Sequence, residues 1–88
     1  MAEYQEVKRI CEMSDKEIRK ENKWKKSEGK YGLWCLKQVV LFRDYFDLWR
    51  TATSMAFLDT SCSKKDVYHE PFSKLVCEYA LQIAEKEQ

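Results

Sequence analysis

The fold is decided by residues 31–58, which read YGLWCLKQVVLFRDYFDLWRTATSMAFL and are called the central segment below. Placed on a helix at about 100° per residue, its apolar side chains cover roughly half of the circumference. These side chains are Trp34, Leu41, Phe42, Tyr45, Phe46, Leu48, Trp49, Ala52, Met55 and Ala56. A strand is disfavoured because neighbours such as Tyr45 and Phe46 share one character instead of alternating. The pattern predicts a long amphipathic, aromatic-rich central helix.

The length of the central segment raises a packing question. A straight helix of this length would run about 42 Å. A compact chain of 88 residues has a diameter of only about 31 Å. We therefore expect either two helices, with a break at the polar cluster from Thr51 to Ser54, or one helix that projects into a partner.

Helical patterns also flank the central segment. Residues 2–13 place apolar side chains at helical spacing. Ser14 and Glu17 match a capping box, which predicts a break near Ser14 and a second helix that runs to Lys26. The alternative is one continuous helix in which Ile18 extends the same face. After Pro71, which suits the first turn of a helix, apolar residues again recur at helical spacing.

The composition agrees with a helical protein. Two Gly and one Pro are too few for the many tight turns of a small strand-rich domain. We predict an all-α fold, a single domain over residues 1–88 in which three to five helices form a small bundle around the central helix. Residues 15–30 hold few apolar side chains, so they form either a solvated helix or a partly ordered connector.

The charge is unevenly distributed, although the net charge is only +1. Residues 16–30, the basic band, carry a net charge of +4, and the two ends of the chain are acidic. The candidate basic surface comprises Lys16, Arg19, Lys20, Lys23, Trp24, Lys25, Lys26 and Lys30. Lysine and arginine neutralise phosphates, and an interleaved aromatic ring can stack on a base.

Two observations weaken a nucleic-acid function for the basic band. Acidic residues lie four positions from basic ones, so Asp15 is expected to pair with Arg19, and Glu21 with Lys25. The pI of about 7.6 is also below the value of about 9 that is typical of dedicated nucleic-acid domains. Nucleic-acid binding is therefore the alternative function, and a solvated helix face is the simpler interpretation.

The four cysteines are Cys11, Cys35, Cys62 and Cys77, and their wide spacing is unlike that of structural zinc sites. Convergence of Cys62, His69 and Cys77 is an open alternative to buried cysteines that act as small hydrophobic residues. No phosphate-binding loop or nucleophile motif is present. We expect that the protein is not an enzyme and that it binds no metal, no cofactor and no small-molecule substrate.

The expected location is the cytoplasm, or the nucleus if the source is eukaryotic. The amino terminus is polar and lacks the pattern of an export signal, so free thiols in a reducing compartment are expected. The longest purely apolar run is too short to cross a membrane. A metal-stabilised or redox module is a third functional class, which a chelator or a reductant would destabilise.

Aromatic residues of the central segment belong to the types that dominate binding hot spots, although they also suit a small helical core. A strict 4-3 spacing, the lower limit for a coiled-coil seam, is followed by Trp34, Gln38, Leu41, Tyr45, Leu48, Ala52 and Met55. We predict a non-catalytic helical adaptor or inhibitor that binds another protein, with a homodimer as one form of that contact. The predicted protein-binding residues are Trp34, Tyr45, Trp49, Arg50 and Phe57.

Overall fold

The computed structural model describes residues 2–25, 32–60 and 69–87. All regular elements in these ranges are helices, which confirms the predicted all-α bundle. They are α1 (Ala2–Glu12), α2 (Asp15–Glu21), α3 (Leu33–Asp44), α4 (Phe46–Thr60) and α5 (Glu70–Lys86).

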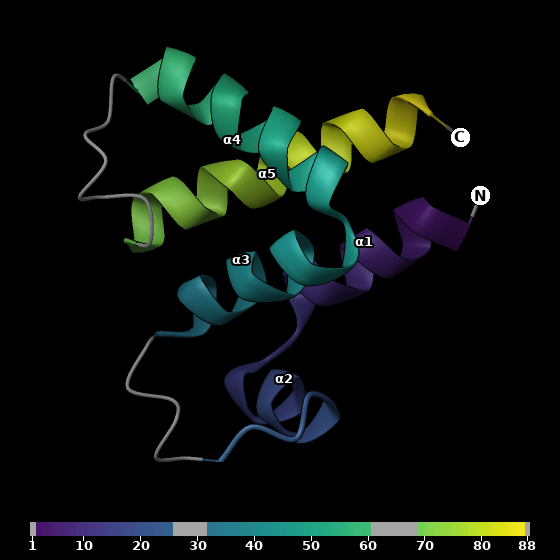
Figure 1. The fold of residues 1–88 in the computed structure, drawn as a ribbon, viewed down its shortest axis with the longest axis vertical. Helices are drawn as coiled ribbons and strands as arrows, with labels where there is room; N and C mark the ends of the chain where they lie inside the picture. Colours follow the sequence, from purple (N-terminus) through teal and green to yellow (C-terminus); the bar gives the residue numbers. More distant parts are fainter. Residues whose placement is uncertain (1, 26–31, 61–68, 88) are drawn as a thin grey trace.

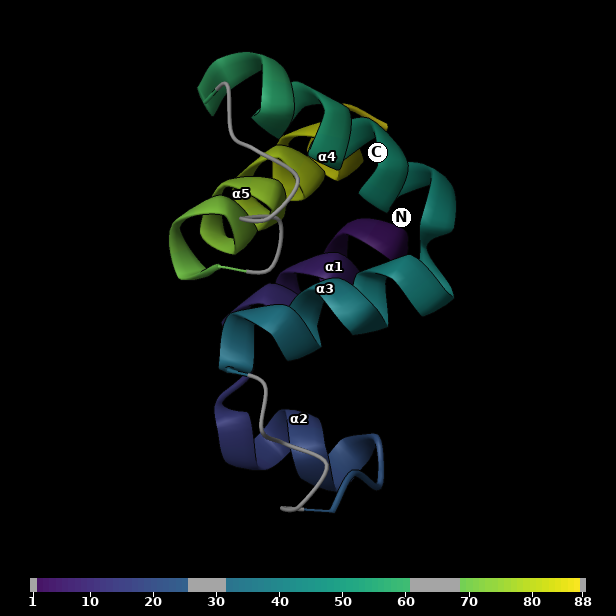
Figure 2. The same cartoon turned by 60° about the vertical axis from the view of Figure 1, so that its left-hand side comes forward.

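The helices are arranged in two adjoining pairs with a short helix at one end (Figure 1). Helices α4 and α5 make the most extensive contact and lie side by side, while α1 and α3 pack together and both contact α5. Helix α2 contacts α3 at the end of the molecule away from α4 (Figure 2). The core therefore lies between the α4–α5 pair and the α1–α3 pair.

The central segment forms two helices, and the break lies at Tyr45, so the predicted break at Thr51–Ser54 is wrong. Tyr45 has φ −138° and ψ 58°, and its N–H donates to the Leu41 carbonyl at 2.8 Å. Thr51 and Ser54 instead lie within α4, where their hydroxyls donate to the carbonyl oxygens four residues earlier, at 3.0 Å each. The bend at Tyr45 brings the apolar face of α4 onto α5.

The predicted break at Ser14 is confirmed. One bond differs from the predicted capping box, because the Glu17 carboxylate accepts from the Ser14 hydroxyl. The Ser14 hydroxyl oxygen accepts a hydrogen bond from the Glu17 backbone N–H at 3.2 Å. The same hydroxyl donates to the Glu17 carboxylate at 3.0 Å. Helix α2 ends at Glu21 instead of Lys26, because Asn22 caps it and Lys23 has a left-handed φ of 58°.

Most residues of the predicted coiled-coil seam are buried within this chain. Gln38, Leu41, Leu48 and Ala52 are all buried, and the helix breaks at Tyr45 in the middle of the seam. A continuous seam for self-association is therefore wrong for this fold. These side chains instead pack in the core formed with α1 and α5.

Small side chains allow α4 and α5 to pack closely. Ala52 and Ala56 lie one turn apart on α4, and Ala80 and Ala84 do the same on α5; all four are buried in the core. Alanine has no side-chain atoms beyond Cβ, so two helix backbones can approach where alanines face a partner helix.

Replacing Ala56 with leucine is expected to lower the free energy of unfolding by about 1–3 kcal/mol, because a well-packed core accommodates extra carbons only by strain or backbone movement. Urea denaturation followed by circular dichroism measures the change. The control is Ser54→Leu, which adds a leucine at an exposed position of the same helix and should change stability by no more than about 0.5 kcal/mol. Equal losses in the two variants would contradict close packing at Ala56.

Candidate functional site

Three aromatic rings meet where α3 turns into α4. The centroid of Phe42 lies 5.2 Å from that of Phe46 and 4.9 Å from that of Trp49, both in edge-to-face geometry. Phe46 and Trp49 are stacked with centroids 6.2 Å apart. Aromatic pairs favour these separations and angles. Together with Val39, which lies one turn before Phe42, these residues are called the aromatic patch.

The aromatic patch presents apolar surface to solvent. Phe42 is 49% exposed, Phe46 is 47% exposed and Val39 is 38% exposed. Such a cluster is unusual because exposed hydrophobic residues on monomers are normally scattered singly, and a contiguous patch is often functional. The patch has the residue types of a binding surface.

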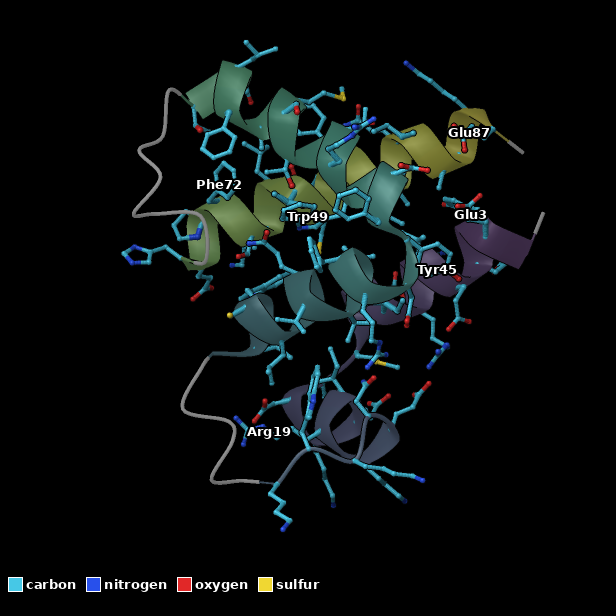
Figure 3. All side chains as sticks on the ribbon, in the orientation of Figure 1. Glu3, Arg19, Tyr45, Trp49, Phe72 and Glu87 are labelled. Atoms are coloured by element: carbon cyan, nitrogen blue, oxygen red, sulfur yellow. The ribbon has the colours of Figure 1, made fainter. Side chains whose placement is uncertain are left out.

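Trp49 connects the aromatic patch to the core. It is half-buried, and its indole Nε1 donates to the buried Gln38 Oε1 at 3.1 Å. Figure 3 shows Trp49 between α3 and α4, near the corner at Tyr45. Because Trp49 is held in this way and the two phenylalanine rings pack on it, the three side chains have little freedom to move.

Charged residues are close to the aromatic residues in the sequence of α3 and α4. Asp47 and Arg50 are exposed next to Phe46 and Trp49 in the sequence of α4. Arg43 bonds to the Asp44 carboxylate at 2.8 Å, which holds the pKa of the Asp44 carboxyl below its ordinary value.

Some of the five predicted protein-binding residues lie at the aromatic patch, and the others pack against the core. Trp49 belongs to the aromatic patch, and Arg50 is exposed beside it. Trp34, Tyr45 and Phe57 are half-buried and pack against the core. Their role in binding stays a prediction, and the structure gives only Trp49 and Arg50 a place at the patch.

Two of the half-buried aromatic rings have close neighbours of their own. The Lys37 ammonium lies 3.8 Å from the centroid of the Trp34 ring, and the Lys74 ammonium lies 5.5 Å from it, both within cation–π range. Phe57 packs on Phe72 with ring centroids 4.9 Å apart. These rings therefore already have partners within the chain.

The exposure of Val39, Phe42 and Phe46 was not predicted from the sequence. The predicted helix put Phe42 and Phe46 on the apolar half that faces the core. The chain changes direction at Tyr45, between Phe42 and Phe46. A single helical wheel drawn over residues 31–58 therefore does not predict which side chains of α3 and of α4 face the core. The available signal was the width of the apolar half, which exceeds what a small core needs.

The basic band is only partly an open cationic surface. Lys16, Lys20, Lys23 and Lys25 are exposed. Trp24 is half-buried and packs against the core, so its ring is not a free stacking platform. Lys26 and Lys30 lie outside the described residues.

Ion pairs link the basic band to the rest of the fold. Arg19 Nε lies 3.2 Å from Asp15 Oδ1, which confirms the predicted pair. Glu21 binds Arg9 of α1 at 2.7 Å, and the Glu21–Lys25 pair stays a prediction. Arg9 also bonds to Glu6, and this hydrogen bond lowers the pKa of the Glu6 carboxyl. The carboxylates in the hollow between α1, α2 and α3 are thus paired with arginines.

The described cysteines are free thiols, since Cys11, Cys35 and Cys77 are all reduced and buried. Cys62 lies outside the described residues, and so does the suggested convergence of Cys62 with His69 and Cys77. Over residues 2–25, 32–60 and 69–87, no group of three or more His, Cys, Asp or Glu side chains is arranged to hold a metal ion. Within the same ranges, the length and apolar character that crossing a membrane requires are not found in any helix.

Comparison of this chain with protein-family models, with curated proteins and with solved structures gave no match. Its function is therefore argued from its own surfaces.

Proposed function

We propose that this chain is a non-catalytic protein-binding module, a small helical adaptor or inhibitor, that contacts its partner through the aromatic patch. The observation that carries this proposal is the exposure of Phe42 and Phe46 on a ring cluster ordered by Trp49. Aromatic residues surrounded by a polar rim are the usual centre of a protein–protein interface. The cytoplasmic or nuclear location expected from the sequence stays part of this proposal.

The energy available at the aromatic patch is sufficient for a binding hot spot. Fully burying one exposed phenylalanine side chain stabilises by about 1.5–3 kcal/mol, so covering two half-exposed rings contributes about the same, 1.5–3 kcal/mol. That corresponds to roughly a 10- to 150-fold change in affinity. A partner with an apolar groove fits this surface, and a second copy of the chain is an alternative occupant.

The test compares two variants that each remove exposed hydrophobic surface. Phe42→Ser/Phe46→Ser alters the aromatic patch, whereas Leu58→Ser alters an 86%-exposed leucine near the other end of α4. Proteins captured by the tagged wild-type chain are purified and their Kd is measured by calorimetry. We expect the double variant to lose at least about tenfold in affinity, or about 1.4 kcal/mol, and Leu58→Ser to match the wild type.

Controls separate the possible results. Circular dichroism must show that both variants remain helical, and sedimentation equilibrium of the wild type identifies a second copy as the partner. Equal binding by the double variant and by Leu58→Ser would contradict the proposed surface.

The alternative function, nucleic-acid binding, is supported by the exposure of Lys16, Lys20, Lys23 and Lys25. A gel shift that is present at about 50 mM salt and lost by about 200 mM would indicate phosphate contacts of this kind. Replacing Lys16, Lys20 and Lys23 with serine should then abolish the shift. No shift at low salt would contradict this alternative.

A further inference from the structure

Arg50 is an exposed arginine of α4 close to the aromatic patch. It follows Phe46 by four residues, and side chains four residues apart are neighbours on the surface of a helix. Arg43, the other arginine near the patch in the sequence, is already bonded to Asp44. Arg50, in contrast, forms no ion pair within the described residues. Since arginine is enriched in binding hot spots, a partner that covers the patch should offer a carboxylate to Arg50.

Asp47 presents a carboxylate on the same helix. It is exposed three residues before Arg50, so the two side chains are also neighbours, and it has no ion pair in the parts of the chain that the structure describes. Asp47 lines a hollow of about 330 Å³ with Glu3 of α1 and Glu87 of α5, which Figure 3 shows at neighbouring helix ends. None of the described residues that line this hollow is a lysine or an arginine. The surface at Asp47 is therefore negative and favours an incoming cation.

The charges on this part of α4 are complementary to themselves. An available cation and an available anion stand beside the exposed rings of Phe42 and Phe46. In a twofold interface, residue i of one copy contacts residue j of the other, and residue j contacts residue i. When two copies meet here with their α4 helices antiparallel, Arg50 of each copy faces Asp47 of the other.

We infer that the partner of the aromatic patch is a second copy of this chain. In the resulting twofold dimer, Phe42 and Phe46 of the two copies pack together, and Arg50 of each copy pairs with Asp47 of the other. The inference rests on the proposed function, because it names an occupant for the same surface. A different protein is the alternative occupant, and the experiments below separate the two.

The size of the patch indicates a weak dimer. Stable protein interfaces bury about 800 Å² on each partner. Phe42 and Phe46 are each about half exposed, so together they offer the area of one aromatic side chain, about 150–250 Å². We therefore expect the dimer to form at protein concentrations between about 10 μM and 1 mM, as weak interfaces do.

The first experiment measures self-association of the full chain by sedimentation equilibrium across that concentration range. We expect a monomer–dimer equilibrium for the wild type and a dissociation constant at least about tenfold higher for Phe42→Ser/Phe46→Ser. Circular dichroism shows whether the variant remains helical. A wild type that stays monomeric, or a folded double variant that dimerises as well as the wild type, would overturn the inference.

Failure of the dimer can be told apart from failure of the proposed function. A monomeric wild type, together with a captured protein that loses affinity for Phe42→Ser/Phe46→Ser, would leave the proposed function standing and overturn the dimer. A double variant that both dimerises and binds a captured protein as the wild type does would overturn both, because the patch would then be no interface.

The second experiment reverses the two charges one at a time. In a twofold dimer, Asp47→Arg makes arginines face arginines, and Arg50→Asp makes aspartates face aspartates. Like charges across an interface oppose association, so each variant alone should have a dissociation constant at least about tenfold above that of the wild type. Asp47→Arg/Arg50→Asp exchanges the charges and should dimerise again. Wild-type dimerisation of either single variant would overturn the pairing.

A mixture of the two single variants gives the sharpest test, because arginines of one then face aspartates of the other. We expect a heterodimer, which native mass spectrometry identifies because the two variants differ in mass, although each variant alone is monomeric. Its formation also shows that both variants are folded. The control is Glu78→Lys, which reverses an exposed charge of α5 and should dimerise like the wild type. A mixture that stays monomeric would overturn the twofold arrangement.

Discussion

Replacing Gln38 with alanine is expected to lower the free energy of unfolding by about 2–4 kcal/mol. Gln38 is only 1% exposed, and its side-chain nitrogen donates to the Ser73 hydroxyl of α5 at 2.6 Å. Its oxygen accepts from the Trp49 indole of α4. Alanine would leave the buried Ser73 hydroxyl and the half-buried Trp49 indole without these bonds, and it would also open a cavity.

Urea denaturation of Gln38→Ala and Ser73→Ala, alone and together, measures how much of this loss belongs to the bond between them. We expect the double variant to lose less than the sum of the single variants, with a coupling energy of about 1 kcal/mol. The matched control is Gln82→Ala, an exposed glutamine of α5, which should change stability by no more than about 0.5 kcal/mol. If the losses in free energy of unfolding of the two single variants simply add in the double variant, the Gln38–Ser73 hydrogen bond does not contribute to stability.

The Gln38 bond also links stability to the candidate binding surface. Trp49 is held by Gln38 and supports the rings of Phe42 and Phe46. Loss of the bond should loosen Trp49 and raise the cost of ordering the patch when a partner binds. The same substitution therefore acts on the fold and on the proposed interface.

Much of the fold could be predicted from the sequence because helical signals are local. The apolar spacing before Ser14 and after Pro71 predicts helices that the structure contains as α1 and α5. The Ser14 cap acts within one turn of helix, so the residues that form it are adjacent in the sequence. The break at Tyr45 had no comparable local signal, because neither proline nor glycine occurs near it.

The surface was harder to predict because exposure depends on packing between distant segments. The sequence indicated that the central segment has excess apolar surface, but not which side chains α1 and α5 would cover. Trp34 and Phe57 are packed within the chain, while Phe42 and Phe46 are exposed. The hydrogen bond from Lys37 to the Cys11 carbonyl likewise joins α3 to α1, which no spacing along the chain reveals.

Replacing Leu41 with alanine is expected to lower the free energy of unfolding by about 2–5 kcal/mol, the range for a fully buried leucine. Leu41 is 0% exposed in the core, and it lies one turn before the break at Tyr45. Since small domains have a total stability of about 5–15 kcal/mol, the variant should unfold at a much lower urea concentration.

The control for Leu41→Ala is the same substitution at Leu58, which is 86% exposed on α4. Leu58→Ala should change the free energy of unfolding by no more than about 0.5 kcal/mol, because little apolar surface leaves water at that position when the chain folds. A loss for Leu41→Ala as small as that expected for Leu58→Ala would show that Leu41 is not enclosed in the core. It would also remove the argument for the aromatic patch, since the exposure of Phe42 follows from the same rotation of α3 that buries Leu41.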